Sequence, residues 1–517
     1  MTDTLASVLA QQCGARTTRP LLICDDDRIT YAEAGTRSAR LARGLVALGA
    51  GKGTHIGLLY PNGSSFVVAM LAAARIGAVV VPFTTFGTAP ELRHQLRHAD
   101  IRILLATPSF RSHDYRARLR DLCTISRVAP AKWCTNPKVP SLRHVVFEQA
   151  DLDALADQAP ESLLAALEAD VDPCDPLAII YTSGSTAAPK GVIHTNGSLI
   201  GHQRGLNEIR ALTADDVLFC NSPFFWVGGF AFGLLATLVA GATLVCSNAT
   251  DPNATLDLLE AEKPTVTNGF AATVTRLAGH PSFAGRNLAS MRRGNLYPVM
   301  PPDVRPADPE LRHNMLGLTE TGGTVLLCAD ETDQPESRRG SFGRPAPGFE
   351  LKIIDPDGAP TLPGDPGELC FRGAFLMQRY HRRSREESFD ADGWLHTGDT
   401  VCTDLDGFVY FLGRRTAMIK TAGANVSPLE VENAITRVAG LTAYVIGLPD
   451  AVRGQIVAAV IALRSGQLFD EGTTRDRLKT QLSSYKVPRT FAVVAETDIA
   501  MLSSGKVDRR RLEEHFA

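Results

Sequence analysis

The 517-residue chain is poor in several features that mark specialised protein classes. Its ten cysteines are sparse for this length and none forms a C-x-x-C pair, so neither a disulfide scaffold nor a zinc or redox motif is indicated. A net charge of −3 gives no electrostatic reason to expect nucleic-acid binding. Residues 1–4 carry no basic stretch leading into an apolar run, so we expect no signal peptide and a reducing, cytoplasmic location.

Long hydrophobic runs are also rare, and the one exception needs a separate interpretation. The segment from Phe224 to Cys246 has no charged residue and is long enough to cross a bilayer. However, it is interrupted by glycines, and Gly241 with Ala242 is typical of a turn before a strand from Thr243 to Cys246. We therefore predict a buried helix, turn and strand here, and no integral membrane segment.

The first 110 residues alternate apolar, strand-like runs with amphipathic, helix-like runs. This alternation is typical of βα units with mostly parallel sheets. The predicted strands are residues 55–60, 78–83 and 101–106, and the predicted helices are residues 64–76 and 90–98. Residues 109–176 are weakly periodic and contain several prolines, so they are interpreted as a connection to a second βα half that begins at Leu177.

The sequence pattern of the last third of the chain indicates two further structural parts. Residues 340–368 contain repeated prolines and glycines between short extended runs, which predicts a small β subdomain. Gly413 and Arg414 mark the expected boundary to a compact α+β C-terminal domain. Its predicted strands are residues 443–447, 456–463 and 491–494.

A loop made of hydroxyl residues and glycine lies between Tyr181 and Gly191, with the sequence YTSGSTAAPKG. It follows an apolar run that reads as a buried strand. Such a loop offers many hydrogen-bond donors, close backbone approach and one positive charge at Lys190, which a polyphosphate needs. Pro189 stands where a Walker loop has its second glycine, which disfavours a P-loop kinase. Taken alone, the loop fits a flexible surface turn equally well.

Further motifs follow this loop along the chain. They are Leu316–Thr321 (LGLTET), Asp392–Asp399 (DGWLHTGD), Gly413–Arg414, Ile419–Lys420, Pro428–Glu432 (PLEVE) and Ser504–Arg509 (SGKVDR). In this order and at these separations, the motifs resemble the adenylate-forming superfamily of acyl-CoA synthetases, firefly luciferase and peptide-synthetase adenylation domains. The resemblance runs from Thr30 to Lys506, and the agreement of several motifs makes it specific. Only ten of the 53 basic residues are lysines, yet Lys190, Lys420 and Lys506 all fall in motifs.

The resemblance implies a fold and an activity. The fold is α/β: a large N-terminal domain of stacked βα sheets with a small β subdomain (residues 1–413, ATP and acid binding) and a small, mobile α+β C-terminal domain (residues 414–517) that carries the catalytic lysine. The implied activity is activation of a carboxylic acid by ATP as an acyl-AMP, followed by transfer to a thiol, with coenzyme A as the expected co-substrate. Adenylation needs positioning and positive charge rather than a protein nucleophile, which agrees with the lack of a Ser-His-Asp or Cys-His signature.

The resemblance also assigns ATP contacts. The phosphates would contact the loop residues Thr182, Ser183, Gly184, Ser185, Thr186 and Lys190, and the nucleotide would further contact Gly317, Thr319, Asp399, Arg414 and Lys506. Thr186 and Glu320 would hold Mg²⁺, a hard cation that prefers oxygen ligands. Asp399 would accept hydrogen bonds from the ribose hydroxyls. Lys506 would bridge the substrate carboxylate and the α-phosphate during adenylation.

Each of these residues also has an ordinary structural interpretation. Glu320 follows Thr319 as a carboxylate at a helix N-terminus commonly does. Asp399 could form a turn with its own backbone after Gly398. Arg414 could make a domain-boundary salt bridge, and Lys506 could be a solvated lysine in a basic tail.

The acid pocket and the thiol tunnel are assigned less directly. Trp226 occupies the place where the superfamily has a histidine or aromatic residue at the acyl pocket, and a core tryptophan is an equally good interpretation. Gly228 and Gly229 follow it and are expected to leave space beside the ring. Tyr297 is assigned to the same pocket and could assist the adenine. Gly423 matches a tunnel glycine, because pantetheine must pass close to the backbone.

The sequence departs from the superfamily pattern at three places. The hinge position, commonly Asp or Lys, is Ala417. The aromatic residue that stacks on adenine is replaced by Leu316, and the glycine-rich adenine loop by residues 295–298 (NLYP). These changes put adenine stacking, hinge motion and the second half-reaction in doubt. They keep open the activation of a small oxyanion such as nitrite. Transfer to a carrier protein or an amine is a further alternative within the superfamily. A catalytically silent nucleotide-binding homologue is the alternative from another class, and the intact set of Lys506, Glu320, Asp399 and Arg414 argues against it.

Overall fold

The computed structural model describes residues 3–120, 136–182, 189–414, 418–464, 466–500, 507–509 and 511–516. The chain divides into two compact units. The first consists of Met1–Thr85, Leu96–Tyr181 and Gly191–Gly413, and the second of Phe86–Gln95, Thr182–Lys190 and Arg414–Ala517. The predicted α/β class, with a large N-terminal and a small C-terminal part, is confirmed.

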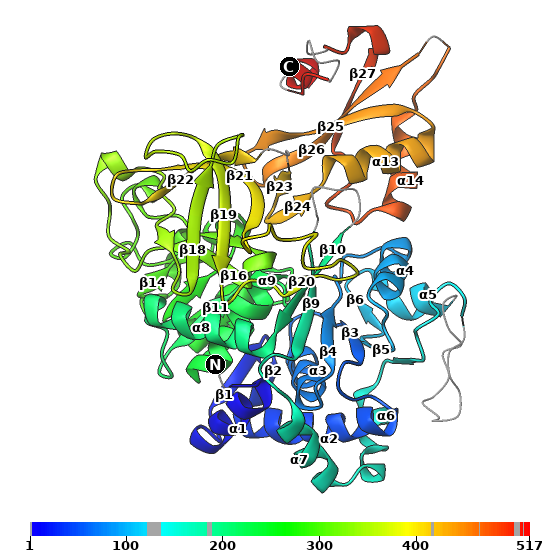
Figure 1. Cartoon of the computed structure of the whole chain (residues 1–517), viewed down its shortest axis with the longest axis vertical. Coiled ribbons are helices and arrows are strands. Elements are labelled where there is room, and N and C mark those ends of the chain that lie inside the picture. Colours follow the sequence, from blue (N-terminus) through cyan, green and yellow to red (C-terminus); the bar gives the residue numbers. More distant parts are fainter. Residues whose placement is uncertain are drawn as a thin grey trace. The chain divides into compact units, whose positions relative to one another are not determined.

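A seven-stranded sheet forms one layer of the first unit (Figure 1). Its order is β20 (Arg379–Tyr380), β10 (Lys190–Thr195), β9 (Pro176–Thr182), β4 (Val79–Pro82), β3 (His55–Leu59), β5 (Ile103–Ala106) and β8 (His144–Val146). Strands β4, β3, β5 and β8 run parallel, as the βα alternation of the sequence predicts. β20 joins antiparallel to β10 at the edge of the sheet, with Tyr380 opposite Val192.

A six-stranded sheet forms a second layer of this unit. Its order is β14 (Arg293–Gly294), β13 (Val266–Asn268), β11 (Val217–Cys220), β12 (Thr243–Cys246), β1 (Pro20–Cys24) and β2 (Asp27–Thr30). All neighbours in it run parallel except β1 and β2. Parallel strands share a carboxyl edge, which is where open α/β sheets bind ligands.

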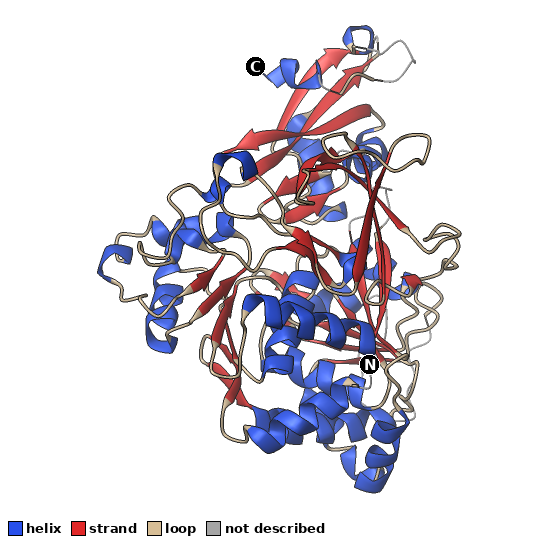
Figure 2. Ribbon diagram, turned by 60° about the vertical axis from the view of Figure 1, so that its left-hand side comes forward, coloured by secondary structure: helices blue, strands red, loops and turns tan. Residues whose placement is uncertain are grey.

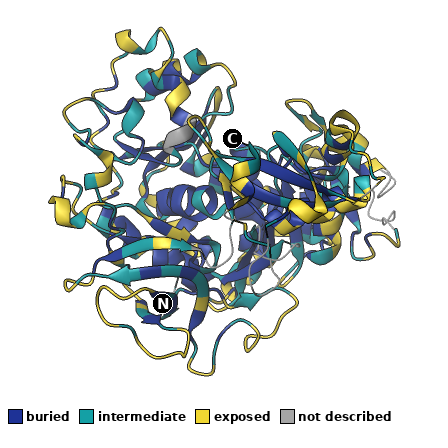
Figure 3. Ribbon diagram, turned by 90° about the horizontal axis from the view of Figure 1, so that it is seen from above, coloured by how far each residue is buried: buried dark blue, intermediate teal, exposed yellow. Residues whose placement is uncertain are grey.

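Helices pack on these sheets (Figure 2), and most of them share one hydrophobic core with both sheets. The helices of the first unit are α1 (Leu5–Ala15), α2 (Tyr31–Ala47), α3 (Ser64–Arg75), α5 (Tyr115–Arg120), α6 (Gln149–Asp153), α7 (Glu161–Asp170), α8 (Asn196–Arg210), α9 (Val227–Gly229), α10 (Ala236–Ala240), α11 (Pro252–Glu262) and α12 (Ala271–Ala278). α3 has no charge before Arg75 and is rich in alanine, so it can be buried on nearly all sides. Figure 3 shows helices and strands with many buried positions, and exposed positions on many of the loops.

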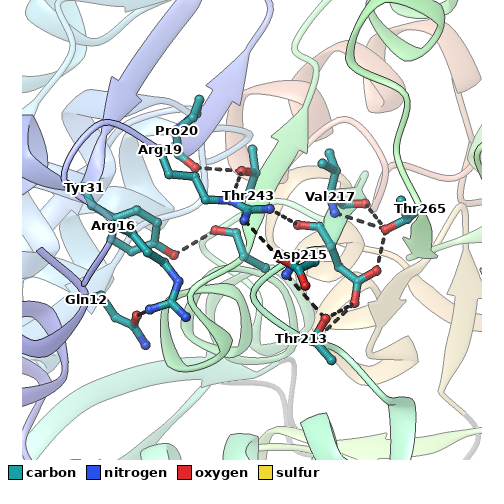
Figure 4. Close-up of polar contacts among 12 residues, drawn as sticks. Gln12, Arg16, Arg19, Pro20, Tyr31, Thr213, Asp215, Val217, Thr243 and Thr265 are labelled. Carbon is teal, nitrogen blue, oxygen red and sulfur yellow. Dashed lines mark hydrogen bonds and ion pairs between the residues drawn. The ribbon is translucent and has the colours of Figure 1, made fainter.

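The N-terminal segment is fastened to the six-stranded sheet by polar side chains (Figure 4). The Tyr31 hydroxyl donates to the carbonyl of Ala242 at 2.8 Å, and the Thr243 hydroxyl donates to the carbonyl of Pro20 at 2.8 Å. Thr30 and Glu33 form a capping box that starts α2. These contacts fix β1 beside β12, although the two strands lie far apart in the sequence.

The first unit also contains two smaller antiparallel sheets. One contains β15 (Leu316–Leu318), β16 (Gly323–Leu327) and β17 (Arg344–Pro345); the other contains β18 (Phe349–Ile354), β19 (Gly367–Gly373), β21 (Leu395–Thr403) and β22 (Val409–Arg414). They share a hydrophobic core that includes Leu316, Phe371 and Leu395. The four-stranded sheet is the small β subdomain that repeated prolines and glycines predict.

The second unit is an α+β structure around its own core. Its sheet runs β24 (Ala424–Val426), β23 (Ile419–Thr421), β26 (Gly454–Leu463) and β25 (Thr442–Asp450), with β27 (Thr490–Ala495) also paired to β26. Helices α13 (Pro428–Ala439) and α14 (Glu471–Gln481) belong to it, together with the first turns of α4 (Ala89–His98).

The described parts of the segment, residues 109–120 and 136–176, contain regular elements, so the interpretation of residues 109–176 as no more than a connection is wrong there. A short hairpin of β6 (Ser109–Phe110) and β7 (His113–Asp114) opens the segment, and β8 extends the seven-stranded sheet. The three residues of β8 are too few to show a hydrophobic period. The order of helix, turn and strand within Phe224–Cys246 is present, with a π-helix from Phe230 to Leu235 before α10. Within the described ranges, we find no helix with the length and apolarity to cross a membrane.

Candidate active site

The predicted phosphate loop is described only at its two ends. Thr182 is the last residue of β9 and Lys190 the first residue of β10. Ser183, Gly184, Ser185, Thr186 and Lys506 lie outside the described residues, and so does Ala417. Arg414 ends β22. The strands therefore fix where the loop leaves and re-enters the seven-stranded sheet.

Glu320 lies in a single helical turn, Thr319–Thr321, between β15 and β16. Its Oε1 atom accepts a hydrogen bond from the Tyr380 hydroxyl at 2.8 Å, and its carbonyl accepts one from the N–H of Met377 at 2.8 Å. Tyr380 also pairs with Val192 in β10, two residues after Lys190. The edge strand β20 thus joins the Glu320 turn to the strand that follows the phosphate loop.

Three buried side chains support this turn from β10 and α8. The Nε2–H of His194 donates to the carbonyl of Thr319 at 2.7 Å, and that of His202 to the carbonyl of Thr324 at 2.9 Å. The Nε2 amide of Gln203 donates to the carbonyl of Gly322 at 3.0 Å. Burial lowers the pKa of both histidines to about 4, so both rings are neutral near pH 7. The turn is therefore held by neutral donors.

Gly317 and Leu316 of β15 have different surroundings. Gly317 is exposed, and a Cβ there would lie 3.0 Å from the carbonyl oxygen of Gly323, so glycine permits the close approach of β15 and β16. Leu316 is 8% exposed and belongs to the hydrophobic core. The residue that replaces the expected aromatic side chain therefore packs mainly against the protein.

Trp226 stands immediately before α9, at the carboxyl end of the six-stranded sheet. Its ring is half-buried and meets Phe225 and Phe270 edge-on, with centroids 5.5 and 5.9 Å away. The expectation that both following glycines leave space is wrong for Gly229, where a Cβ would lie 2.1 Å from the carbonyl oxygen of Pro223. At Gly228 a Cβ would meet its nearest atom at 3.7 Å, so only this glycine leaves space.

Two asparagines close the same edge of the sheet. Asn295 belongs to the segment 295–298 that departs from the superfamily pattern, whereas no motif of the sequence points to Asn221. Asn295 exchanges two hydrogen bonds with the backbone of Gly269, at 2.9 and 3.1 Å, and Asn221 does the same with Phe270, at 3.2 and 3.0 Å. Three of these residues lie where a strand ends: Asn221 directly follows β11, Gly269 follows β13 and Asn295 follows β14. Tyr297 packs half-buried on the neighbouring hydrophobic cluster, and burial raises the pKa of its hydroxyl.

Asp399 lies within β21 and is 1% exposed. Its backbone N–H donates to the Thr397 hydroxyl at 3.1 Å, and Gly398 before it adopts a positive φ of 72°. A left-handed residue inside a strand marks an irregular ladder, and such irregularities re-aim side chains beside active sites. The predicted ribose ligand is therefore held in a distorted strand.

Gly423 has a structural role that the sequence did not indicate. It forms the hairpin turn between β23 and β24 with Ala422, and both residues have positive φ, 85° and 48°. Two such residues make the tight turn that matches the twist of a hairpin. The geometry of this turn alone explains the glycine.

The implied Mg²⁺ is compatible with the described donors only if the phosphates supply most of its ligands. Glu320 has one oxygen engaged by Tyr380, and no described residue hydrogen-bonds to the other. Across the described ranges, no three His, Cys, Asp or Glu side chains converge to form a metal site. Mg²⁺ is commonly held by one or two protein oxygens together with substrate phosphates, so the fit is adequate.

The chain is similar to known proteins over most of its length. The family model of AMP-binding enzymes matches residues 9–381, and that of the AMP-binding enzyme C-terminal domain matches residues 430–506. A feruloyl-CoA synthase from an Amycolatopsis species is 31% identical over 502 residues, which cover 94% of each chain. A sulfoacetate–CoA ligase from Cupriavidus necator is 28% identical over 524 residues, 99% of this chain and 98% of that protein. A solved o-succinylbenzoate CoA synthetase from Bacillus subtilis shares the fold with a TM-score of 0.80, 24% identity and 99% coverage of both chains.

Proposed function

The chain belongs to the family of AMP-binding enzymes and is an AMP-forming acid–thiol ligase, and from this premise we propose the reaction that it catalyses. A carboxylate oxygen of the acid attacks the α-phosphorus of ATP, the bond to the β-phosphate oxygen breaks, and pyrophosphate leaves. The thiolate of coenzyme A then attacks the acyl carbon and AMP leaves with one oxygen of the acid. The acceptor is coenzyme A in this proposal because the similar proteins carry CoA-ligase names.

The observation that carries the proposal is the match of both family models in chain order. The second match ends on Lys506, the residue that the sequence motif assigns to the α-phosphate. An ammonium there would neutralise charge where the attacking carboxylate and the phosphate oxygens crowd together. The division of the roles between residues 1–413 and 414–517 belongs to the same proposal.

The described residues support distinct parts of this chemistry. Glu320 offers a carboxylate on a turn that Tyr380, His194 and His202 hold in place. Mg²⁺, when bound there and by Thr186, would neutralise phosphate charge. Asp399 would orient the ribose from its distorted strand, and Arg414 would assist it. Orientation matters because positioning supplies a large part of the rate in a reaction without a protein nucleophile.

The acid would lie at the carboxyl edge of the six-stranded sheet, beside Trp226. The edges of Trp226 and Phe270 are apolar surfaces suited to an aryl or alkyl group, and Gly228 leaves space next to them. A feruloyl-CoA synthase among the relatives favours an aryl acid as the first substrate to test. The alternatives are a carrier protein or an amine as acceptor, and a small oxyanion as substrate. The assay described next separates them from the proposed reaction.

The test is an acid screen for pyrophosphate release, run with and without coenzyme A. Acid-dependent ATP–pyrophosphate exchange, with thioester formed only when coenzyme A is present, supports the proposal. Lys506→Ala should abolish exchange but spare thioester formation from a supplied acyl-AMP. If no acid of any class supports exchange, a silent nucleotide-binding homologue is favoured instead. Equal loss of both steps in Lys506→Ala would contradict the role of this lysine.

A further inference from the structure

The ladder between β19 and β21 is broken beside Asp399. Glu368 of β19 pairs with Thr400 of β21, and Cys370 pairs with His396. Leu369 alone therefore lies opposite the three residues 397–399. Three residues opposite one is a bulge, and it contains Asp399. Gly398 supplies the left-handed backbone that the bulge needs, and nothing lies within 4 Å of where its Cβ would be. Backbone conformation, not space, therefore selects this glycine.

Side chains replace the missing ladder bonds inside the bulge. The Thr397 hydroxyl donates to the carbonyl of Leu369 at 2.7 Å and accepts the N–H of Asp399. Oε1 of Glu368 accepts the N–H of Gly398 at 3.1 Å. A carboxylate is a stronger acceptor for a backbone N–H than a neutral oxygen. Glu368 thus fixes the peptide between Thr397 and Gly398, and the Thr397 hydroxyl fixes the next one, between Gly398 and Asp399.

Glu368 is itself held in one orientation by its neighbours. Its other oxygen, Oε2, lies 3.3 Å from Nδ1 of His396, whose Nε2 lies 3.3 Å from Asp390. Lys352 is 3.5 Å from the same Asp390 carboxylate. The Glu368 side chain is only 14% exposed, so these contacts restrict its rotamer. No part of the proposed reaction uses this chain of contacts directly.

We propose that Glu368 is a positioning residue for nucleotide binding. It pins the bulge through Gly398 and so sets the direction in which the Asp399 carboxylate faces the ribose hydroxyls. The inference rests on the proposed function, because it takes Asp399 as the ribose ligand. It predicts that Glu368 contributes to affinity only when the nucleotide has hydroxyls for Asp399 to bind.

The experiment compares dissociation constants for ATP and for 2′,3′-dideoxy-ATP, measured by calorimetry on the full chain. Glu368→Ala should weaken ATP binding about tenfold, the scale of one hydrogen bond to a charged group, and leave dideoxy-ATP binding unchanged. Glu368→Gln keeps an acceptor oxygen and should restore most of the ATP affinity. Thr397→Val removes the two hydrogen bonds of the Thr397 hydroxyl in the bulge and should reproduce the ribose-specific loss, which keeps the test available if Glu368→Ala does not fold.

Two controls separate the inference from its premise. Glu350→Gln, on the same sheet but in an exposed pair with Arg372, should not change either constant. Asp399→Ala should abolish the preference for ATP over dideoxy-ATP; if it does not, the ribose assignment is wrong and the inference falls with it. If Asp399→Ala behaves as expected while Glu368→Ala keeps the full preference, or weakens both nucleotides equally, only the role of Glu368 is overturned.

Discussion

At the scale of single residues, the side chain of Trp226 is partly exposed beside the proposed acid site. Its ring is neither sealed in the core nor free on the surface, because it is half-buried and meets Phe225 and Phe270 edge-on. Its backbone carbonyl accepts the N–H groups of Gly229 and Phe230, which starts the helix that follows. The backbone contacts would survive truncation of the side chain, so substitution tests the ring alone.

Trp226→Ala should shift the acid preference toward bulkier substrates with nearly unchanged ATP affinity. Loss of two aromatic edge contacts should cost about 1–3 kcal/mol of unfolding free energy, at about 0.5–1.5 kcal/mol each. The measurement pairs thermal unfolding with kinetics on acids of increasing size. A stability loss with an unchanged order of substrates would remove Trp226 from the acid pocket.

The two glycines after Trp226 should respond differently to the same substitution. Gly229→Ala places a methyl group 2.1 Å from the carbonyl of Pro223, which forces the backbone to move and should cost about 1–3 kcal/mol or more. Gly228→Ala is the matched control, because its Cβ has 3.7 Å to the nearest atom. Denaturant unfolding of both variants checks the difference, and equal stability of the two would refute the packing argument.

At the scale of elements, the turn that carries Glu320 depends on β10 and α8. The neutral rings of His194 and His202 hold it by donating to the carbonyls of Thr319 and Thr324. Protonation of a ring would place an uncompensated charge in a buried position. The turn should therefore loosen in acid before the rest of the unit does.

Acidification should destabilise the protein through these two histidines. Unfolded histidine titrates near 6.5 and the folded rings at about 4, so the unfolded state binds more protons between these values and stability falls as pH drops through this range. From pH 7 to pH 5 the loss should be about 2 kcal/mol per histidine. His202→Gln should remove about half of this slope in urea unfolding curves, and an unchanged slope would contradict the assignment.

The sequence predicted elements better than it predicted their contacts. Predicted strands at 55–60 and 78–83 and the helix at 64–76 agree with β3, β4 and α3 because long apolar runs have a clear period. β8 was missed because it has only three residues. Glu320 and Asp399 stand out in motifs, whereas their supporting partners Tyr380 and Glu368 do not, because those lie 60 and 30 residues away from the groups they bind.

At the scale of the whole molecule, the second unit includes a piece of the N-terminal sequence. Phe86 meets Tyr485 edge-on with ring centroids 6.0 Å apart, and Glu91 and Glu430 both bind Lys486 at 2.8 Å. Burial alone would lower the pKa of Lys486, but Tyr485 and the two carboxylates raise it, so the lysine stays charged. The three charges form one buried cluster.

Lys486→Met should destabilise the second unit by about 3–5 kcal/mol, since it leaves Glu91 and Glu430 buried beside each other without a counter-charge. Lys479→Met is the control, because its pair with Asp476 is exposed and should be worth less than about 1 kcal/mol. Denaturant unfolding followed by far-ultraviolet circular dichroism compares them. Equal effects of the two substitutions would show that the buried cluster contributes little.

The central claim, that the enzyme activates an acid as an acyl-AMP, is tested most directly with oxygen-18. An acid that supports turnover in the screen is labelled at both carboxylate oxygens and converted with ATP and coenzyme A, and the products are analysed by mass spectrometry. The account predicts one labelled oxygen in AMP and none in pyrophosphate, because the attacking carboxylate oxygen stays on the α-phosphate. Unlabelled AMP, or label in orthophosphate with ADP as co-product, would contradict it.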